Sequence, residues 1–208
     1  MPAERATAAI EDAASPFVYP DTASSRAGIE AVSRRLAGGT IAIIGLGGTG
    51  SVVLDLISKT PADRILLVDG DTAEQHNAFR SPGAMSIEDI AAGHTKVAYF
   101  AKIYGRMHRG IEAYPMHLTP ETMSLLHETD FVFVCVDNVA ARAFIVPTLD
   151  ALRLPYIDCG LGLSLVDDRL MGQIRVTTST PVMRDHVYAG DRIPLRGDAD
   201  DALYHSNI

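Results

Sequence analysis

The chain has 208 residues, of which 47% are hydrophobic and 21% charged, and this composition is typical of one soluble globular domain. Its formal net charge of −8 argues against a nucleic-acid or membrane-surface partner, because both require clustered Lys and Arg. No membrane span or signal peptide is visible, and the two cysteines, Cys135 and Cys159, form no CxxC pair. We therefore expect a cytoplasmic protein in a reducing compartment.

The N-terminal segment, residues 1–25, is rich in Ala, Glu, Asp, Ser and Pro, and we expect it to be a flexible arm. The first helix is predicted within residues 24–39. Its apolar side chains recur with helical spacing at Ile29, Val32 and Leu36, and a glycine pair ends the run.

Short apolar runs alternate with helical patterns along the rest of the chain. Strands are predicted at 40–44, 64–69, 111–118, 130–137 and 154–160. Helices are predicted at 48–60, 94–108, 120–128 and 138–153. Beyond Gly162 the pattern changes to an extended, antiparallel segment at 169–181 and a loop-rich tail at 184–208.

This alternation predicts an α/β fold over residues 26–208. We expect a Rossmann-like, doubly wound and mainly parallel sheet with helices on both faces. The sheet should continue into antiparallel strands on its C-terminal side.

A glycine-rich loop connects the first predicted strand to the next helix. Gly45, Gly47 and Gly50 satisfy the pattern G-x-G-x-x-G, in which glycines let the backbone approach a phosphate at a helix N-terminus. Asp69, nineteen residues after Gly50 at the end of the next strand, is placed to bond a ribose hydroxyl. The pattern alone does not separate a dinucleotide from ATP, and glycines that only allow close packing remain an alternative.

The loop after Asp69 favours a nucleoside triphosphate, because a triphosphate requires fixed cations and a metal-binding carboxylate. Arg80 offers a bidentate guanidinium, and Lys96 offers a point charge at a helix start. Asp137 ends a buried strand and is a candidate Mg²⁺ ligand. Alternatively, Arg80 and Lys96 are surface residues and Asp137 caps the helix that begins at Asn138.

Taken in order, these residues resemble the ThiF/MoeB/HesA family, the bacterial relatives of ubiquitin-activating enzymes. The family pattern stands here as Gly45-Leu-Gly47-Gly48-Thr-Gly50, Asp69-Gly-Asp71, Asn77-Ala-Phe-Arg80, Gly93-His-Thr-Lys96 and Asp137-Asn138, followed by Arg142. The match covers roughly residues 26–178. More narrowly, the chain looks like a ThiF domain found beside bacterial ubiquitin-like, conjugating-enzyme-like and peptidase genes.

The resemblance implies an adenylyltransferase that uses ATP and Mg²⁺. It would activate the C-terminal carboxylate of a ubiquitin-like or sulfur-carrier protein, usually ending in Gly-Gly, as an acyl adenylate. It also implies a homodimer in which an N-terminal arginine, here Arg26 by rough spacing, reaches the neighbour's ATP. A conjugating-enzyme-like protein is a further candidate partner.

The resemblance also implies roles for single residues. Asp69 would hold the ribose, and Asp137 would hold Mg²⁺. The phosphates would be contacted by Asn77, Arg80 and Lys96. Four further residues are expected at the nucleotide: Gly45, Gly47, Gly48 and Gly50. Asn138 is expected there as well, and Asp71 is expected to orient Arg80.

The chain departs from the family pattern after the sheet. Residues 163–208 contain no cysteine that could form a thioester, and the paired zinc cysteines of many relatives are missing. Cys135 is interpreted as a buried apolar residue. Cys159 is less inert by its position at a strand end near the expected site, although its apolar neighbours should raise its pKa. Because relatives continue into another helix beyond the matching position, we expect a C-terminally truncated domain.

Two other functions remain open at this point. One is a non-catalytic scaffold half of an activating-enzyme dimer, and the other is an NAD-dependent oxidoreductase suggested by the glycine pattern and Asp69. The seven histidines show no metal-binding or catalytic spacing. His76 and His94 flank the phosphate-side loops, and we expect neither to be essential.

Overall fold

The computed structural model describes residues 15–190 and 192–196. Their centre is a six-stranded sheet in the order β3-β2-β1-β4-β5-β6. The strands are β1 (Thr40–Ile44), β2 (Arg64–Val68), β3 (Ile111–Tyr114), β4 (Phe131–Val134), β5 (Tyr156–Val166) and β6 (Arg169–Ser179). The first five are parallel and β6 is antiparallel to β5, so the predicted fold class is confirmed.

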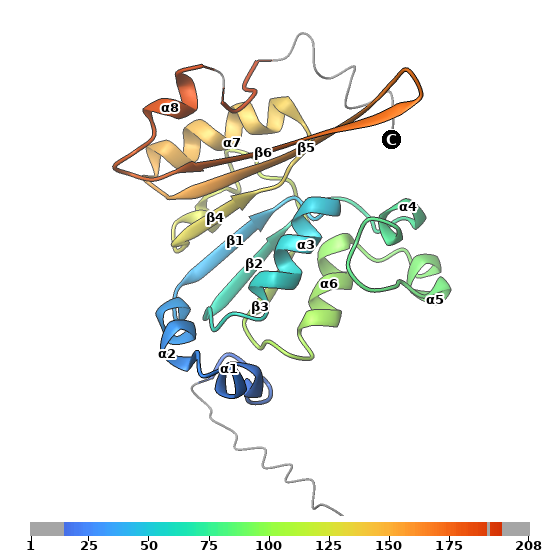
Figure 1. The fold of residues 1–208 in the computed structure, drawn as a ribbon, viewed down its shortest axis with the longest axis vertical. Coiled ribbons are helices and arrows are strands. Elements are labelled where there is room, and N and C mark those ends of the chain that lie inside the picture. Colours follow the sequence, from blue (N-terminus) through green and yellow to red (C-terminus); the bar gives the residue numbers. More distant parts are fainter. Residues whose placement is uncertain (1–14, 191, 197–208) are drawn as a thin grey trace, which may run out of the picture.

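Helices cover both faces of the sheet (Figure 1). The longer ones are α3 (Gly48–Ile57), α6 (Lys96–Tyr104) and α7 (Val139–Ala151). Short ones are α1 (Thr22–Ala27), α2 (Glu30–Ser33), η1 (Arg34–Leu36), α4 (Gln75–Ala78), α5 (Ile87–Ala91), η2 (Met123–Leu126) and α8 (Asp185–Tyr188).

Two hydrophobic clusters form because successive strand residues point to opposite faces. In β1, Ile43 packs with α3 and α6, whereas Ala42 and Ile44 pack with α7, η2 and α8. Since both faces are covered, the central strands are continuous apolar runs, as expected of parallel strands. The core therefore fixes the direction in which each strand end points.

The N-terminal region differs from its prediction. Residues 1–14 of the predicted arm lie outside the described residues. Within the described part, Val18 N–H donates to the Met107 carbonyl at 2.8 Å and the Phe17 ring packs edge-on against His108. The predicted helix at 24–39 breaks at Gly28, whose φ of +67° is left-handed, into α1, α2 and η1.

His108 anchors this region to the sheet and is fully buried. Its Nε2 lies 2.9 Å from the Ala62 carbonyl, and its Nδ1 accepts the Gly110 N–H at 3.1 Å. These partners fix the neutral ring with the proton on Nε2. Burial is the main cause that lowers the pKa of His108, which keeps the ring neutral.

The C-terminal side of the sheet is a long hairpin that extends beyond the helices (Figure 1). β5 and β6 pair over eleven positions from Tyr156↔Ser179 to Val166↔Arg169. The antiparallel segment predicted at 169–181 is confirmed, but β5 continues past its predicted end at residue 160. The four-residue helix α8 lies in the tail that was predicted as loop, of which residues 191 and 197–208 lie outside the described residues.

Candidate nucleotide site at the carboxyl edge of the sheet

The glycine loop lies between β1 and α3 at the carboxyl edge of the sheet. Gly45 has a φ of +88°, and its N–H donates to the Val68 carbonyl of β2 at 2.8 Å. A methyl group on Gly50 would lie 1.9 Å from the Gly45 carbonyl oxygen. These two glycines are therefore required by the close approach of α3 to β1.

The next part of the loop faces open space. A methyl group on Gly47, the N-cap of α3, would meet no atom within 4 Å. No side chain caps the first turn of α3, so its backbone N–H groups point to that space. A methyl group on Gly48 would lie 3.3 Å from Cβ of Arg80. The start of α3 thus combines free N–H donors with a neighbouring guanidinium, an arrangement suited to an anion.

Asp69 ties the loop to the end of β2. Its Oδ2 accepts the Leu46 N–H at 2.6 Å and its Oδ1 accepts the Asp71 N–H at 2.8 Å. The residue is 8% exposed. Each carboxylate oxygen can accept a second hydrogen bond, so this structural role leaves capacity for a ligand hydroxyl.

Asp71 pairs with Lys96, and the expectation that it orients Arg80 was wrong. Lys96 Nζ lies 2.7 Å from Asp71 Oδ2 and 3.8 Å from Asp69 Oδ1. The hydrogen bond from Lys96 is the main cause that lowers the pKa of Asp71 below its ordinary value. The N-cap Thr95 fixes the start of α6 and hence Lys96, which is 8% exposed. His117 Nε2 lies 3.8 Å from Asp71 Oδ1 on the other side.

Asn77 lies in α4, and Arg80 lies in the loop that follows this helix. Asn77 is 3% exposed, and its Oδ1 accepts the Glu74 N–H at 2.8 Å as part of a capping box. Its Nδ2 lies 3.1 Å from Nε2 of His76. The Asn77 amide is therefore used to shape the loop, whereas Arg80 is exposed.

The end of β4 forms the other side of the loop. Asp137 is exposed, and Asn138 rather than Asp137 caps α7, by accepting the Ala141 N–H at 3.0 Å. A methyl group on Gly45 would lie 2.8 Å from the Cys135 carbonyl oxygen, so the end of β4 contacts the glycine loop. Arg80 and the chain that leads from β4 to Asp137 hence border the glycine loop at different positions.

Arg142 holds this strand end in place, and its partner Asp158 was not predicted from the sequence. Its Nε lies 3.0 Å from Oδ1 of Asp158 in β5, with side chains 2% and 0% exposed. Its terminal nitrogens donate to the carbonyl groups of Val136 and Asp137. Arg175 of β6 lies 3.0 Å from the other oxygen of Asp158. These contacts join α7, β5 and β6 to the segment that follows β4.

Arg26 is the predicted site residue that the fold does not bring to this edge. It lies in α1, at the amino end of the strands and opposite the glycine loop (Figure 1). Its predicted role toward a neighbouring subunit stays a prediction.

The expectation of a raised pKa for Cys159 was wrong. A hydrogen bond from the Cys135 thiol is the main cause that lowers the pKa of Cys159, and the same bond, with burial, raises the pKa of Cys135. The sequence interpretation considered only apolar neighbours, whereas the fold supplies a second thiol.

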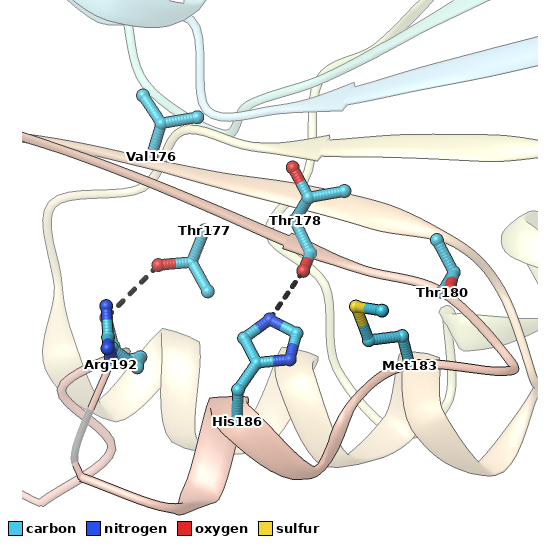
Figure 2. Close-up of a pocket in the computed structure, with 7 residues that line it drawn as sticks. All are labelled: Val176, Thr177, Thr178, Thr180, Met183, His186 and Arg192. Atoms are coloured by element: carbon cyan, nitrogen blue, oxygen red, sulfur yellow. Dashed lines mark hydrogen bonds between the residues drawn. The ribbon is translucent and has the colours of Figure 1, made fainter.

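No group of three or more His, Cys, Asp and Glu in ranges 15–190 and 192–196 has a geometry that could hold a metal ion. A cavity of about 300 Å³ lies beside β6 and contains none of the predicted site residues (Figure 2). It is lined by Val176, Thr177, Thr178, Thr180, Met183, His186 and Arg192. None of the helices described has the length and apolarity needed to cross a bilayer.

Comparison with protein families and curated proteins gives consistent matches. A ThiF family model matches residues 23–193. Ubiquitin-like modifier-activating enzyme 5 of Arabidopsis thaliana is 26% identical over 173 residues, which are 74% of this chain and 38% of that protein. Adenylyltransferase and sulfurtransferase MOCS3 of Sus scrofa is 32% identical over 111 residues, or 52% of this chain and 24% of that protein.

Solved structures share the fold at low sequence identity. E. coli TcdA, a tRNA N6-threonylcarbamoyladenosine dehydratase in complex with AMP, is 19% identical with a TM-score of 0.61, covering 70% of this chain and 60% of that one. E. coli MccB with MccA-N7isoASN is 19% identical with a TM-score of 0.58, covering 69% and 46%. This chain spans less than two thirds of the length of these proteins.

Proposed function

The chain belongs to the ThiF family, and from this premise we propose that it is an ATP-dependent adenylyltransferase that activates a protein or peptide carboxylate. The observation that carries the proposal is the open N-terminus of α3 between Arg80 and the end of β4, with Lys96 buried beside it. ATP is the proposed substrate, and AMP in the TcdA structure supports it. The family match favours this function over a nicotinamide-dependent oxidoreductase.

The nucleotide is proposed to bind along the carboxyl edge. Backbone N–H groups at the start of α3 would receive the phosphates, because their partial positive charge is unsatisfied there. Gly47 leaves the space for that approach. Asp69, with both oxygens already held by backbone N–H groups, would accept a ribose hydroxyl in a fixed position.

Two side chains are proposed to neutralise the triphosphate. Arg80 is exposed beside Gly48 and can offer two parallel N–H bonds. Lys96 has three N–H donors, of which one is directed to Asp71, so it can share its charge with a phosphate. Asp71 holds the ammonium group of Lys96 at the edge of the sheet when no nucleotide is bound, which is the proposed role of Asp71.

Asp137 is the proposed Mg²⁺ ligand. Mg²⁺ commonly binds through one or two carboxylates together with substrate phosphates, so a single exposed carboxylate at this edge fits. When bound, the ion would neutralise phosphate charge. Arg142 positions the backbone of Asp137 by donating a hydrogen bond to the Asp137 carbonyl group.

The proposed reaction brings a carboxylate to the α-phosphate, forms an acyl adenylate and releases pyrophosphate. Both reactants are anions, so the residues of the edge would act by neutralising charge and by holding the two groups in line. The carboxylate is proposed to end a ubiquitin-like or sulfur-carrier protein of Gly-Gly type. The names of the two curated relatives support this substrate class. A homodimer with Arg26 in the partner's site and a conjugating-enzyme-like acceptor belong to the same proposal.

Calorimetry with Mg·ATP tests the nucleotide site. The chain should bind Mg·ATP, and Arg80→Ala and Asp137→Ala should each weaken binding at least about tenfold with unchanged circular dichroism. Arg106→Ala is the matched control, because Arg106 is an exposed arginine that follows the C-cap of α6. A wild-type chain that binds no Mg·ATP would support the scaffold alternative instead.

ATP–pyrophosphate exchange with a panel of Gly-Gly-ended ubiquitin-like and sulfur-carrier proteins tests the reaction. We expect one member to stimulate exchange, and Arg80→Ala to abolish it. Exchange that no member stimulates, from a chain that binds Mg·ATP, would count against this substrate class.

A further inference from the structure

The two cysteines of the chain lie side by side in the sheet. The last residues paired between β4 and β5 are Val134 and Asp158. One step further in this parallel register places Cys135 beside Cys159. Both are free thiols, 24 positions apart by the sequence but neighbours in the fold.

Both thiols point to the face covered by α3. Asp158 is bound by Arg142 of α7, and Val134 packs in the α7 cluster. Because side chains alternate along a strand, the following residues point the other way. A methyl group on Gly50, in the first turn of α3, would lie 3.2 Å from Cys135 Cβ, which supports this direction. The pair therefore lies directly beneath the glycine loop.

The two thiols differ in exposure. Cys135 is buried at 8% exposure, whereas Cys159 is half-buried. Because a peroxide reaches the more accessible sulfur more readily, Cys159 is suited to react first, with Cys135 as the resolving thiol.

We propose that Cys135 and Cys159 form a peroxide-sensitive dithiol that closes to a reversible disulfide and thereby disturbs the nucleotide loop. The Cys159 thiolate attacks one oxygen of hydrogen peroxide, the O–O bond breaks, and hydroxide leaves a sulfenic acid on Cys159. The Cys135 sulfur then attacks Sγ of Cys159, the S–O bond breaks and water leaves. The Cys135 proton leaves in that water, and the hydroxide takes the proton that Cys159 lost on ionising, so two thiols are oxidised and one peroxide is reduced to two waters.

Closure requires a small movement of the strand ends. Neighbouring strands lie about 4.8 Å apart, within the Cα separation that a disulfide accepts, but Cβ atoms of a disulfide lie about 3.8 Å apart. The end of β4 must therefore shift toward β5. Because the Cys135 carbonyl and Cβ touch the positions of Gly45 and Gly50, the shift is transmitted to the loop.

Peptide mapping after treatment with hydrogen peroxide tests disulfide formation, whatever the chain's function. We expect the protein to lose both alkylatable thiols and to yield one peptide pair joined through Cys135 and Cys159, reversed by dithiothreitol. Cys159→Ser should leave Cys135 alkylatable, and Cys135→Ala should leave Cys159 as sulfenic acid trapped by dimedone. A wild-type protein oxidised to sulfinic acid at Cys159 with Cys135 unmodified would overturn the proposal.

Mg·ATP binding tests whether the disulfide disturbs the nucleotide loop. This part of the proposal rests on the proposed function. Oxidation should weaken binding roughly tenfold or more in the wild type and leave the Cys159→Ser chain unchanged. Equal affinity of oxidised and reduced wild type would refute the coupling. If the reduced protein binds no Mg·ATP, the proposed function fails while the disulfide map still decides the dithiol itself.

Discussion

Replacing Arg142 by leucine removes the guanidinium that joins α7 to β5 and to the end of β4. The substitution leaves Asp158 fully buried with Arg175 as its remaining cation, whose side chain is 27% exposed. It also frees the carbonyl groups of Val136 and Asp137. The backbone at Asp137 should become more mobile even if the protein still folds.

Breaking a buried ion pair by removing one partner typically costs about 3–5 kcal/mol. Arg175 partly compensates Asp158, and water can reach the carbonyl group of Asp137 at this exposed position, so we expect about 3 kcal/mol. Since single domains are stable by about 5–15 kcal/mol, this is a large fraction of the total. Arg142→Lys should be intermediate, because an ammonium group cannot bridge a carboxylate and two carbonyls in one plane.

Urea unfolding followed by circular dichroism measures the loss. Arg64→Leu is the matched control, since Arg64 pairs with Glu112 at 2.7 Å but with side chains 37% and 34% exposed. Such an exposed pair contributes little to stability, because water screens its charges. If Arg142→Leu lowers the unfolding free energy no more than Arg64→Leu does, the buried network does not stabilise the strand end as inferred here.

Two further predictions concern the loop and the sheet edge. Gly50→Ala should lower the unfolding free energy by about 1–3 kcal/mol, because its methyl group would lie 1.9 Å from a carbonyl oxygen. Gly47→Ala should cost less, about 0.5–1 kcal/mol in the same denaturant assay, because its methyl group meets no atom and alanine is only a poorer N-cap than glycine; equal losses would contradict the packing role. The pKa of His108 is lower in the folded state than in the unfolded chain, so at acidic pH the unfolded chain binds a proton on His108 that the folded protein does not. The free energy of unfolding should therefore fall below about pH 6.5, by at most about 1.4 kcal/mol per pH unit. Urea midpoints measured across this pH range give the pH dependence of stability. If a His108→Gln variant shows the same pH dependence as the wild type, His108 is not its cause.

The order of strands and helices could be predicted from the sequence, because it depends on local patterns. Apolar runs at β1 and β2 and the glycines before α3 predict their own conformation, whatever lies elsewhere in the chain. The position of Asp137 at the carboxyl edge of the sheet could also be predicted, because parallel strands all end at the same edge. The break at Gly28 was missed, since one left-handed glycine interrupts an otherwise helical spacing.

Only the tertiary structure decided which side chains meet. The partner of Asp71 is Lys96 rather than Arg80, and the partner of Arg142 is Asp158, although no spacing in the sequence indicates either pair. The register of β4 and β5 likewise brings together thiols that the sequence interpretation treated separately. Strand register and helix placement are set by packing over the whole core, so side-chain partners, and the pKa values that depend on them, cannot be inferred from local sequence.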